Sequence, residues 1–370
     1  MKIGFDGKRA TQNFTGLGNY SRYVLKILAE YYPENQYAVF ASAPVKKALS
    51  LSEYPSINFQ HPKNELFKNF WRSRGIVKDL KKEKIDLFHG LSNEIPIGLK
   101  KAGIPSVVTI HDLIFYRYPQ YYPYFDRKIY ELKVRYASKH VDKIIAVSEQ
   151  TKSDLINFFN VEESRVEVIY QNCDPIFRSK VTEQEKTRIR HTYNLPEEFL
   201  LNVGTIETRK NSLLIVKALK KLEDSIHLVI IGKETPYAQV VKDFITNNNL
   251  MSRVHFLKNV SFHDLPGIYQ QASIFIYPSE FEGFGIPVVE ALNSGIPVIA
   301  AKGSCLEEAG GKNSVYIDST KSDELADQIN LVMNNSEKRA FMIRSGFEHI
   351  SNFSNQKIAD KLFNLYQNLI

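Results

Sequence analysis

The chain has 370 residues, which is too long for one ordinary domain and suits two domains of roughly 170 to 190 residues. With 43% hydrophobic and 24% charged residues, 18 glycines and 15 prolines, it belongs neither to the disordered nor to the fibrous proteins. Its net charge of +7 arises in residues 1–175, which carry 26 Lys and Arg against 19 Asp and Glu, whereas the charges of residues 176–370 balance.

The cysteines and the hydropathy pattern indicate a cytoplasmic protein. Cys173 and Cys305 are the only cysteines and have no partner at metal-ligand spacing, which favours a reducing compartment without a disulfide framework. No signal-peptide pattern precedes the first predicted strand, and no apolar run approaches the roughly 20 residues that span a bilayer. We therefore expect a cytoplasmic location, with at most peripheral attachment to the inner face of the cell membrane.

Short apolar strands and longer helical segments alternate along the chain. In the first half, predicted strands cover residues 3–5, 37–41, 87–89, 106–110, 143–147 and 166–169. In the second half, they cover residues 199–203, 227–231, 254–256, 274–277, 297–300 and 315–317. Helical patterns such as 19–31, 124–138, 212–222 and 323–333 lie between them. Strands without polar alternation, separated by helices, predict parallel sheets covered on both faces, so a doubly wound α/β unit is expected twice.

The join between the two units is expected near residues 172–181, where Cys173-Asp174-Pro175 has the composition of a turn. This divides the chain into a first domain of residues 1–175 and a second of residues 176–353. The last segment, 354–370, is amphipathic and can pack back on the first domain as a helix. Ligands of open α/β sheets bind at the carboxyl ends of the strands, so strand-to-helix loops of both domains should line the site, in a cleft between them.

A basic stretch within residues 63–101 accounts for much of the positive charge. It begins at Lys63, and its basic residues Lys68, Arg72, Arg74, Lys78, Lys81, Lys82 and Lys84 alternate with the aromatic residues Phe67, Phe70 and Trp71. A basic helix with aromatic side chains suits the surface of an anionic bilayer. The alternative is a solvated helix face whose aromatic side chains pack inward. Nucleic acid is not an expected partner, because no recognised motif accompanies the charge.

The most informative segment is 278–290, which follows the predicted strand 274–277 and leads into a helix. Gly283 and Gly285, flanking Phe284, let the loop turn tightly, and Ile286 and Pro287 begin the helix. The free N–H groups at such a helix start suit a phosphate. Glu282 lies in the loop and Glu290 one turn inside the helix, so both carboxylates can address one ligand, and carboxylates bind sugar and ribose hydroxyls well. The alternative is an ordinary helix start with favourable acidic residues.

Glu282 and Glu290 have the spacing of the E-x7-E motif of the retaining glycosyltransferases of family four, which this chain resembles over nearly its whole length. The resemblance also rests on residues 15–20, 109–113, 146–149 and 204–211. It implies the GT-B fold, in which two Rossmann-like doubly wound domains face each other across an interdomain cleft. The chain is similar to the bacterial mannosyl- and rhamnosyltransferases of surface polysaccharide and lipopolysaccharide synthesis. This implies transfer of a hexose, with retention, from a GDP- or UDP-sugar to a glycan or lipid-linked acceptor.

The resemblance also implies that Arg209 and Lys210 contact the donor diphosphate, where fixed cations stabilise the charge of the leaving phosphate. The alternative is an exposed basic pair, which the dipole of the following helix disfavours unless an anion lies nearby. Some family members have an Arg where this chain has Thr205. Thr205 supplies only a hydroxyl, so Arg209 would contribute more of the charge that binds the diphosphate. Gly16 and Gly18 resemble the family's glycine loop, which approaches the donor phosphate, and an ordinary tight turn is the alternative.

In similar enzymes, a His at the position of His111 contacts the transferred sugar, and the alternative is a satisfied polar residue at a strand end. His111, Glu282 and Lys210 are thus the expected catalytic residues. Asp112 is expected to cap the next segment, and His89 is a weaker candidate for acceptor binding in the cleft. Asn172 stands where similar enzymes often have Gly, which leaves the hinge geometry open.

The expected reaction is a substitution on one face of the sugar, in which the departing phosphate takes the acceptor's proton. A double displacement would need a carboxylate nucleophile on the opposite face, and Glu282 is expected to bind sugar hydroxyls instead. The sequence contains no Asp-x-Asp to hold a divalent ion, and Lys210 with the helix start can neutralise the charge. No metal and no other cofactor is therefore expected, since the nucleotide sugar is a substrate.

Two other functions compete with this hypothesis. A nucleotide-sugar epimerase of the same GT-B fold would convert the donor without a sugar acceptor. A protein without catalytic activity would only bind the nucleotide sugar or act as a scaffold, but the combination of Glu282, Glu290, Lys210 and His111 argues against it. Donor turnover that depends on an added acceptor would identify the transferase.

Overall fold

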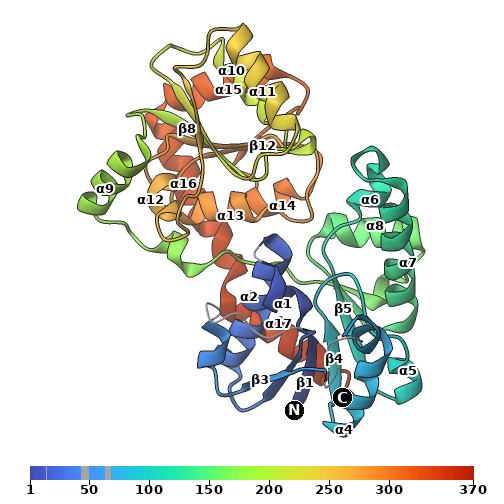
Figure 1. The fold of residues 1–370 in the computed structure, drawn as a ribbon. Coiled ribbons are helices and arrows are strands. Elements are labelled where there is room, and N and C mark those ends of the chain that lie inside the picture. Colours follow the sequence, from blue (N-terminus) through green and yellow to red (C-terminus); the bar gives the residue numbers. More distant parts are fainter. Residues whose placement is uncertain (14, 43–49, 63–67) are drawn as a thin grey trace. The chain divides into compact units, whose positions relative to one another are not determined.

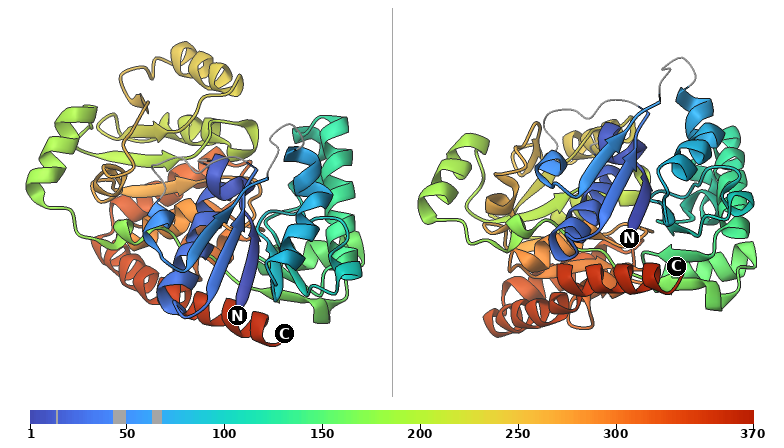
Figure 2. Two further views of the ribbon diagram at one scale, coloured as in Figure 1. Left: turned by 60° about the horizontal axis from the view of Figure 1, so that its bottom comes forward. Right: turned by 90° about the horizontal axis from the view of Figure 1, so that it is seen from below.

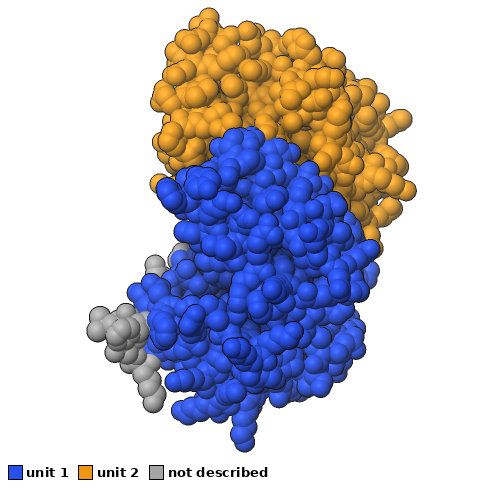
Figure 3. Space-filling model, turned by 90° about the vertical axis from the view of Figure 1, so that its right-hand side faces the viewer, with its two compact units in different colours: residues 1–171, 354–370 blue, residues 172–353 orange. Residues whose placement is uncertain are grey.

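The structure, a computed structural model, describes residues 1–13, 15–42, 50–62 and 68–370 (Figure 1). It divides into two compact units (Figure 3). Unit 1 comprises Met1–Gln171 and Ser354–Ile370, and unit 2 comprises Asn172–Phe353. The first segment of unit 1 thus ends at residue 171, whereas the turn composition placed the end of the first domain at residue 175.

Unit 1 is built on a seven-stranded parallel sheet with the strand order β3-β2-β1-β4-β5-β6-β7. Its strands are β1 (Lys2–Asp6), β2 (Gln36–Phe40), β3 (Ile57–Gln60), β4 (Leu87–Gly90), β5 (Ser106–Ile110), β6 (Lys143–Ala146) and β7 (Val166–Val168). All strands expected in this half are present. The additional strand, β3, lies at the edge of the sheet and buries only Ile57, so polar Asn58 and Gln60 interrupt its apolar pattern.

The helices of unit 1 cover the sheet. They are α1 (Lys8–Gln12), α2 (Gly16–Tyr31), α3 (Lys68–Phe70), α4 (Ile76–Lys82), α5 (Leu99–Ala102), α6 (Ile114–Arg117), α7 (Tyr124–His140), α8 (Glu149–Phe159) and α17 (Asn355–Gln367). A π-helical turn, η3 (Trp71–Gly75), joins α3 to α4. Every residue of β5 is buried, as expected for a central strand of a parallel sheet with helices on both faces.

The C-terminal helix α17 packs on α2, within unit 1. Figure 2 shows α17, in red, alongside the first elements of the unit, in blue. The helix buries Ile358, Leu362 and Leu365, which lie on one face at helical spacing. At the contact with α2, the rings of Tyr32 and Phe363 stack with centroids 3.8 Å apart. The amphipathic pattern of residues 354–370 thus corresponds to a helix that completes the core of unit 1.

Unit 2 is built on a six-stranded parallel sheet with the order β10-β9-β8-β11-β12-β13. Its strands are β8 (Phe199–Val203), β9 (His227–Ile231), β10 (Val254–Leu257), β11 (Ile274–Tyr277), β12 (Val298–Ala301) and β13 (Val315–Ile317). Its helices are α9 (Glu183–Tyr193), α10 (Ser212–Leu219), α11 (Tyr237–Asn247), α12 (Leu265–Tyr269), α13 (Ile286–Asn293), α14 (Leu306–Gly310), α15 (Ser322–Met333) and α16 (Ser336–Ile350). The expected doubly wound α/β architecture is therefore confirmed in both units.

The strand order of each sheet reverses beside its first strand. The reversal falls between β1 and β4 in unit 1, and between β8 and β11 in unit 2. Loops that leave the carboxyl ends of two such strands diverge to opposite faces of the sheet, and the crevice between them is where open α/β sheets bind ligands. The chain order of the strands thus marks one candidate position in each unit. Of the helices that the structure describes, none is both long enough and apolar enough to cross a membrane.

Candidate functional site

In unit 2, the loops that follow β8 and β11 meet where the strand order reverses. The loop after β8 contains Gly204 and Thr205 and then a 3₁₀ turn, η7 (Thr208–Lys210). The loop after β11 contains Glu282 and leads into α13. A backbone hydrogen bond of 2.9 Å from Glu280 N to Arg209 O joins the two loops. The structure therefore brings together the two segments that the sequence predicts to form the donor site.

Glycines permit the close packing of the β8 loop. A Cβ atom on Gly232, which follows β9, would lie 1.8 Å from the carbonyl oxygen of Gly204, so the two strand ends approach too closely for any side chain. Gly204 has a φ of +150°, and Asn211, which precedes α10, has a φ of +56°. Asn211 supports this left-handed conformation, which Asn adopts more readily than most residues, and its side chain donates to Ser319 O over 2.7 Å. This backbone path places Arg209 and Lys210 beside the β11 loop.

The carboxylate of Glu282 is the centre of the resulting cluster. Its Oε1 atom lies 2.9 Å from Arg209 Nη1 and 3.1 Å from Lys210 Nζ. The same atom accepts hydrogen bonds from Ser279 Oγ at 2.7 Å and from the Tyr277 hydroxyl at 3.0 Å. Within the part of the chain that the structure describes, no donor reaches Oε2. One oxygen of Glu282 is thus anchored, and the other is available to a ligand.

The charges of this cluster remain fixed at every ordinary pH. Burial alone would raise the pKa of Glu282, but Lys210 and Arg209 outweigh it and lower that pKa to about 2. Burial would lower the pKa of Lys210, but the carboxylate of Glu282 outweighs it and raises that pKa above its usual value. Arg209 also pairs with Glu207, at 2.7 Å. Two cations and two carboxylates therefore balance, and an arriving anion would compete with Glu282 and Glu207 for the cations.

Helix α13 begins as the sequence predicts. Gly285 precedes it with a φ of +119°, and Pro287 occupies its first turn, where the missing N–H is not needed. A Cβ atom on Gly285 would lie 2.8 Å from Leu306 Cδ2, so α14 also requires a glycine here. Phe284 is buried against Phe353, which fixes the loop ahead of the helix. The N–H groups of Gly283 and Ile286 flank this turn at the positive end of the helix.

Glu290 lies on α13 with its carboxylate partly accessible. The Tyr269 hydroxyl donates to its Oε2 atom over 2.9 Å. Burial is the main reason that the pKa of Glu290 rises to about 7, and the hydrogen bond from Tyr269 counteracts this in part. Glu282 and Glu290 therefore differ in kind, because Glu282 is permanently ionised whereas Glu290 titrates near neutral pH.

In unit 1, His111 directly follows β5 and is buried. Its Nε2 atom lies 2.9 Å from the carbonyl oxygen of Leu91. A carbonyl only accepts, so Nε2 carries the proton and Nδ1 is left as an acceptor. Burial lowers the pKa of His111 to about 4, which keeps the ring neutral. The ring of Tyr20, from α2, packs perpendicular to the His111 ring, with centroids 4.6 Å apart. As expected, Asp112 caps the next segment, because its Oδ1 accepts from Ile114 N.

The expectation for His89 was wrong. Its side chain is completely buried, so it is not available to an acceptor. Its Nδ1 atom lies 2.7 Å from the Tyr366 hydroxyl on α17, and its Nε2 atom lies 2.8 Å from Thr109 Oγ1. The Tyr20 hydroxyl lies 3.0 Å from the same Thr109 oxygen. His89 is thus part of a buried hydrogen-bonded chain that links α17 to Tyr20, the residue that packs on His111. No sequence pattern indicates this hydrogen-bonded chain, since its members lie far apart.

Gly16 and Gly18 do not form a loop, because both lie in the first turn of α2. A Cβ atom on Gly18 would lie 1.8 Å from the carbonyl oxygen of Asn13, so this glycine is required by close packing of the backbone. Gly16 is exposed, with no atom near the position of a Cβ. The glycine pattern therefore marks a helix start, and Tyr20 on the same helix brings that start close to His111.

The basic stretch of unit 1 is only partly a solvated surface. Arg72 is largely buried and pairs with Asp6, which ends β1, and with Glu94. Lys133 also reaches Glu94, at 2.8 Å. Arg74, Lys78, Lys81, Lys82 and Lys84 are exposed. Arg72 is therefore an internal ion-pair partner at the point where the strand order of unit 1 reverses. The expected residues Lys63 and Phe67 lie outside the described residues.

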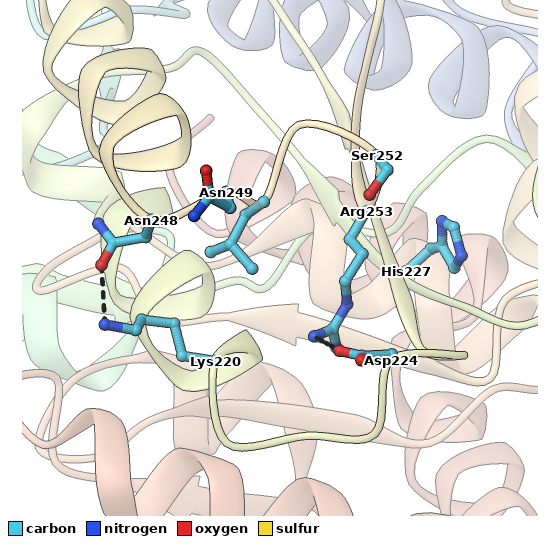
Figure 4. Close-up of a pocket in the computed structure, with 8 residues that line it drawn as sticks. Lys220, Asp224, His227, Asn248, Asn249, Ser252 and Arg253 are labelled. Atoms are coloured by element: carbon cyan, nitrogen blue, oxygen red, sulfur yellow. Dashed lines mark hydrogen bonds and ion pairs between the residues drawn. The ribbon is translucent and has the colours of Figure 1, made fainter.

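A pocket of about 580 Å³ in unit 2 lies elsewhere (Figure 4). It is lined by Lys220, Asp224, His227, Asn248, Asn249, Leu250, Ser252 and Arg253. His227 begins β9 and Arg253 precedes β10, so this pocket is at the amino ends of the strands, opposite the Glu282 cluster. Arg253 is buried and bonded to the carbonyl oxygens of Glu223 and Ile226. The polar groups of Arg253 therefore stabilise the connection between α10 and β9.

Solved structures with the same architecture identify the fold. Anabaena Alr3699/HepE in complex with UDP and glucose superimposes with a TM-score of 0.80, at 20% identity, over 100% of both chains. WaaG, a glycosyltransferase involved in lipopolysaccharide biosynthesis, superimposes with a TM-score of 0.72, at 16% identity, over 98% of this chain and 99% of its own. Two Rossmann-like units of this kind constitute the GT-B fold of glycosyltransferases.

Sequence comparisons define the family. The family model for "Glycosyl transferases group 1" matches residues 183–349, and that for "Glycosyltransferase Family 4" matches residues 21–175. O-antigen chain mannosyltransferase B of Escherichia coli is 26% identical over 99% of this chain and 100% of its own. O-antigen chain mannosyltransferase RfbU of Salmonella typhimurium is 30% identical over 57% of this chain and 56% of its own. The chain belongs to the group 1 glycosyltransferases of family 4.

Proposed function

We propose that this glycosyltransferase transfers mannose, with retention at the anomeric carbon, from a GDP- or UDP-sugar to a lipid-linked or polysaccharide acceptor of a cell-surface glycan. The names of the two O-antigen mannosyltransferases support the sugar and the product class. The complex of HepE with UDP and glucose supports a nucleotide-activated donor. The observation that carries the proposal is the Glu282 carboxylate held by Arg209 and Lys210, with Oε2 left over for a ligand.

Each residue of the unit 2 site has a role in this proposal. Arg209 and Lys210 bind the diphosphate, together with the hydroxyl of Thr205 and the N–H groups of the loop from Gly283 through Phe284 and Gly285 to Ile286. Glu290 accepts hydrogen bonds from the ribose hydroxyls. Glu282 accepts them, through Oε2, from hydroxyls of the transferred sugar.

Unit 1 supplies the remaining contacts of the proposal. The unprotonated Nδ1 of His111 accepts a hydrogen bond from a sugar hydroxyl, since Nε2 is committed to Leu91. The N-terminal turn of α2, with Gly16 and Gly18, approaches the donor phosphates. Convergence of these residues with those of unit 2 is part of the proposal.

In the proposed reaction, the bond between the anomeric carbon and the diphosphate oxygen breaks, and the acceptor oxygen bonds to that carbon on the same face. The departing phosphate oxygen takes the proton of the acceptor hydroxyl, whose oxygen forms the new glycosidic bond. Negative charge grows on the diphosphate as the bond breaks, and Lys210 and Arg209 stabilise it from fixed positions. Glu282 is too firmly ion-paired to act as a nucleophile through Oε1, and it orients the ring instead. A divalent metal is not needed for this chemistry.

Binding of the nucleoside diphosphate is expected to tighten as the pH rises from about 6 to about 8, beyond the effect of phosphate ionisation. Glu290 has a pKa of about 7, and only its ionised form accepts hydrogen bonds from both ribose hydroxyls. One pH unit below its pKa, only about one tenth of a carboxyl is ionised. At that pH, the contribution of the Glu290 carboxylate to the binding constant is therefore about tenfold smaller.

Glu290→Gln is the matched control for this pH dependence, because it has the same shape and cannot ionise. Phosphate ionisation affects both proteins alike, so the ratio of the Kd of Glu290→Gln to that of the wild type isolates the carboxyl. We expect this ratio, measured by calorimetry, to increase with pH. A ratio that is constant between pH 6 and 8 would contradict the assignment of Glu290 to the ribose.

The proposed function is tested by incubating the protein with GDP-mannose or UDP-glucose, a lipid-linked acceptor and excess chelator. We expect acceptor-dependent release of the nucleoside diphosphate and a product with the anomeric configuration of the donor. Activity should survive the chelator, since Arg209 and Lys210 replace the metal. Loss of activity that magnesium or manganese restores would overturn the metal-independent mechanism. An inverted product, or turnover without any acceptor, would overturn the retaining transfer.

A further inference from the structure

Large apolar side chains are exposed in one region of unit 1, around α6 and the start of α7. Phe125 is 78% exposed, Leu132 67% and Tyr124 60%. Ile129, Tyr130 and Tyr116 are also exposed. Apolar side chains so close together in sequence and so accessible are unusual on the surface of a protein that needs no partner there.

The geometry of α7 explains why these side chains remain uncovered. The helix extends from Tyr124 to His140, but its buried residues, Val134, Ala137 and Ser138, all lie in its second half. Its first half therefore has no core-facing stripe of its own. Phe125, Ile129 and Leu132 follow one another at intervals of four and three residues and share one side of the helix. This side forms an apolar stripe that the described residues of unit 1 leave exposed.

Basic side chains accompany the apolar stripe. Residues 116–139 contain Arg117, Arg127, Lys128, Lys133, Arg135 and Lys139, against only Asp126 and Glu131. The guanidinium of Arg127 lies 5.6 Å from the ring centroid of Tyr124, and the ammonium of Lys128 lies 6.0 Å from it. Aromatic and aliphatic side chains beside basic ones are typical of helices that lie in the interface of an anionic bilayer.

The basic stretch around α4 lacks this combination, although it carries more charge. Trp71 is half-buried, donates from Nε1 to Asp79 over 2.6 Å and contacts Phe40. Ile76 and Leu80 face the core, so Phe70 is the one large apolar side chain that remains exposed between residues 68 and 84. Basic residues alone attract a protein to an anionic membrane, but apolar side chains are needed for insertion below the headgroups.

The apolar stripe also lies at a functional edge of unit 1. Helix α6 and the start of α7 follow β5, so they lie at the carboxyl end of that strand, as does His111. In Figure 1, α6 and α7 lie on the right-hand side of unit 1, apart from α4 at its lower end. We propose that Tyr124, Phe125, Ile129 and Leu132, with Arg127 and Lys128, form a surface that docks on an anionic lipid bilayer. This α7 surface would hold the catalytic edge of unit 1 against the membrane.

The test is co-sedimentation with vesicles made of equal parts of phosphatidylglycerol and phosphatidylcholine. The α7 variant combines Phe125→Ser, Ile129→Ser and Leu132→Ser. Its matched control, Leu331→Ser with Phe341→Ser, removes apolar side chains of unit 2 that are 46% and 49% exposed. A charge-reversal variant, Arg74→Glu with Lys81→Glu and Lys82→Glu, tests the α4 stretch. Thermal melting confirms that each variant is folded.

We expect the wild type and the unit 2 control to bind these vesicles, and the α7 variant to bind at least about tenfold more weakly. The charge-reversal variant should lose less binding than the α7 variant. Unchanged binding of the α7 variant, or no binding of the wild type, would overturn the proposal. A wild-type dimer that forms without lipid, and that is lost only in the α7 variant, would also overturn the proposal. The α7 surface would then be a protein interface. Transfer to a water-soluble acceptor should be unaffected in the α7 variant, which separates this proposal from the proposed function.

Discussion

Replacing Lys210 with alanine is expected to lower the turnover number by about 100- to 1,000-fold while weakening donor binding much less. The Lys210 ammonium lies 3.1 Å from Glu282 Oε1 and is held over the ring of Tyr277, 5.0 Å from its centroid. It is largely buried and permanently charged, so its attraction to the diphosphate increases most as the glycosidic bond breaks. Steady-state kinetics beside calorimetry with the nucleoside diphosphate separate the two effects.

The fold should survive this substitution, because Arg209 remains to neutralise Glu282 at 2.9 Å. Lys220→Ala is the matched control. Lys220 is an exposed lysine of the same unit, at the amino edge of the sheet, where it donates to Asn248. Its removal should leave turnover unchanged. If Lys210→Ala stays within about twofold of the wild type, the diphosphate does not bind at this cluster.

The substitution Glu282→Gln should reduce transfer by about 100-fold without weakening the binding of the bare nucleoside diphosphate. Glutamine preserves the shape but replaces one carboxylate oxygen by a donor, so the contact to the hydroxyls of the transferred sugar is lost. At the same time, Arg209 and Lys210 lose the carboxylate that competes with the diphosphate. Binding of the bare diphosphate is therefore expected to remain unchanged or to become tighter.

A transfer assay of Glu282→Gln beside Glu223→Gln gives the necessary comparison, since Glu223 is an exposed glutamate far from the cluster in the same unit. Only the first variant should lose activity. Full activity of Glu282→Gln would show that its charge has no part in the reaction. A loss of activity fully explained by weaker diphosphate binding would place Glu282 on the nucleotide instead of the sugar.

The sequence predicted the sheets well because burial on both faces leaves a simple pattern. Strands such as 106–110, 199–203 and 227–231 are mostly apolar and lack a regular polar alternation, and the structure has β5, β8 and β9 within the same bounds. The edge strand β3 buries only one residue and could not be found in this way. The loop that follows β11, where the strand order of unit 2 reverses, was also predictable, since Gly283, Gly285 and Pro287 are residues that the local backbone requires.

Properties that depend on contacts distant in sequence could not be predicted. The composition of residues 68–84 placed Arg72 with the surface charges, yet Asp6 and Glu94 hold it inside unit 1. His89 looked available at a strand end, but Tyr366 from the far end of the chain covers it. Likewise, the different electrostatic states of the two glutamates depend on the cations Lys210 and Arg209, which lower the pKa of Glu282, and on burial, which raises that of Glu290; no spacing rule reveals either cause.

The central claim is that the two glutamates divide the donor between them, with Glu290 on the ribose and Glu282 on the transferred sugar. The most direct measurement is calorimetric titration of GDP and UDP into the wild type, Glu290→Gln and Glu282→Gln at pH 8. For the nucleotide that binds the wild type, we predict a Kd about tenfold or more higher for Glu290→Gln, because hydrogen bonds to a charged group are lost. The Kd of Glu282→Gln should be unchanged or lower. Equal weakening in both variants, or no effect in either, would contradict the division and with it the proposed donor site.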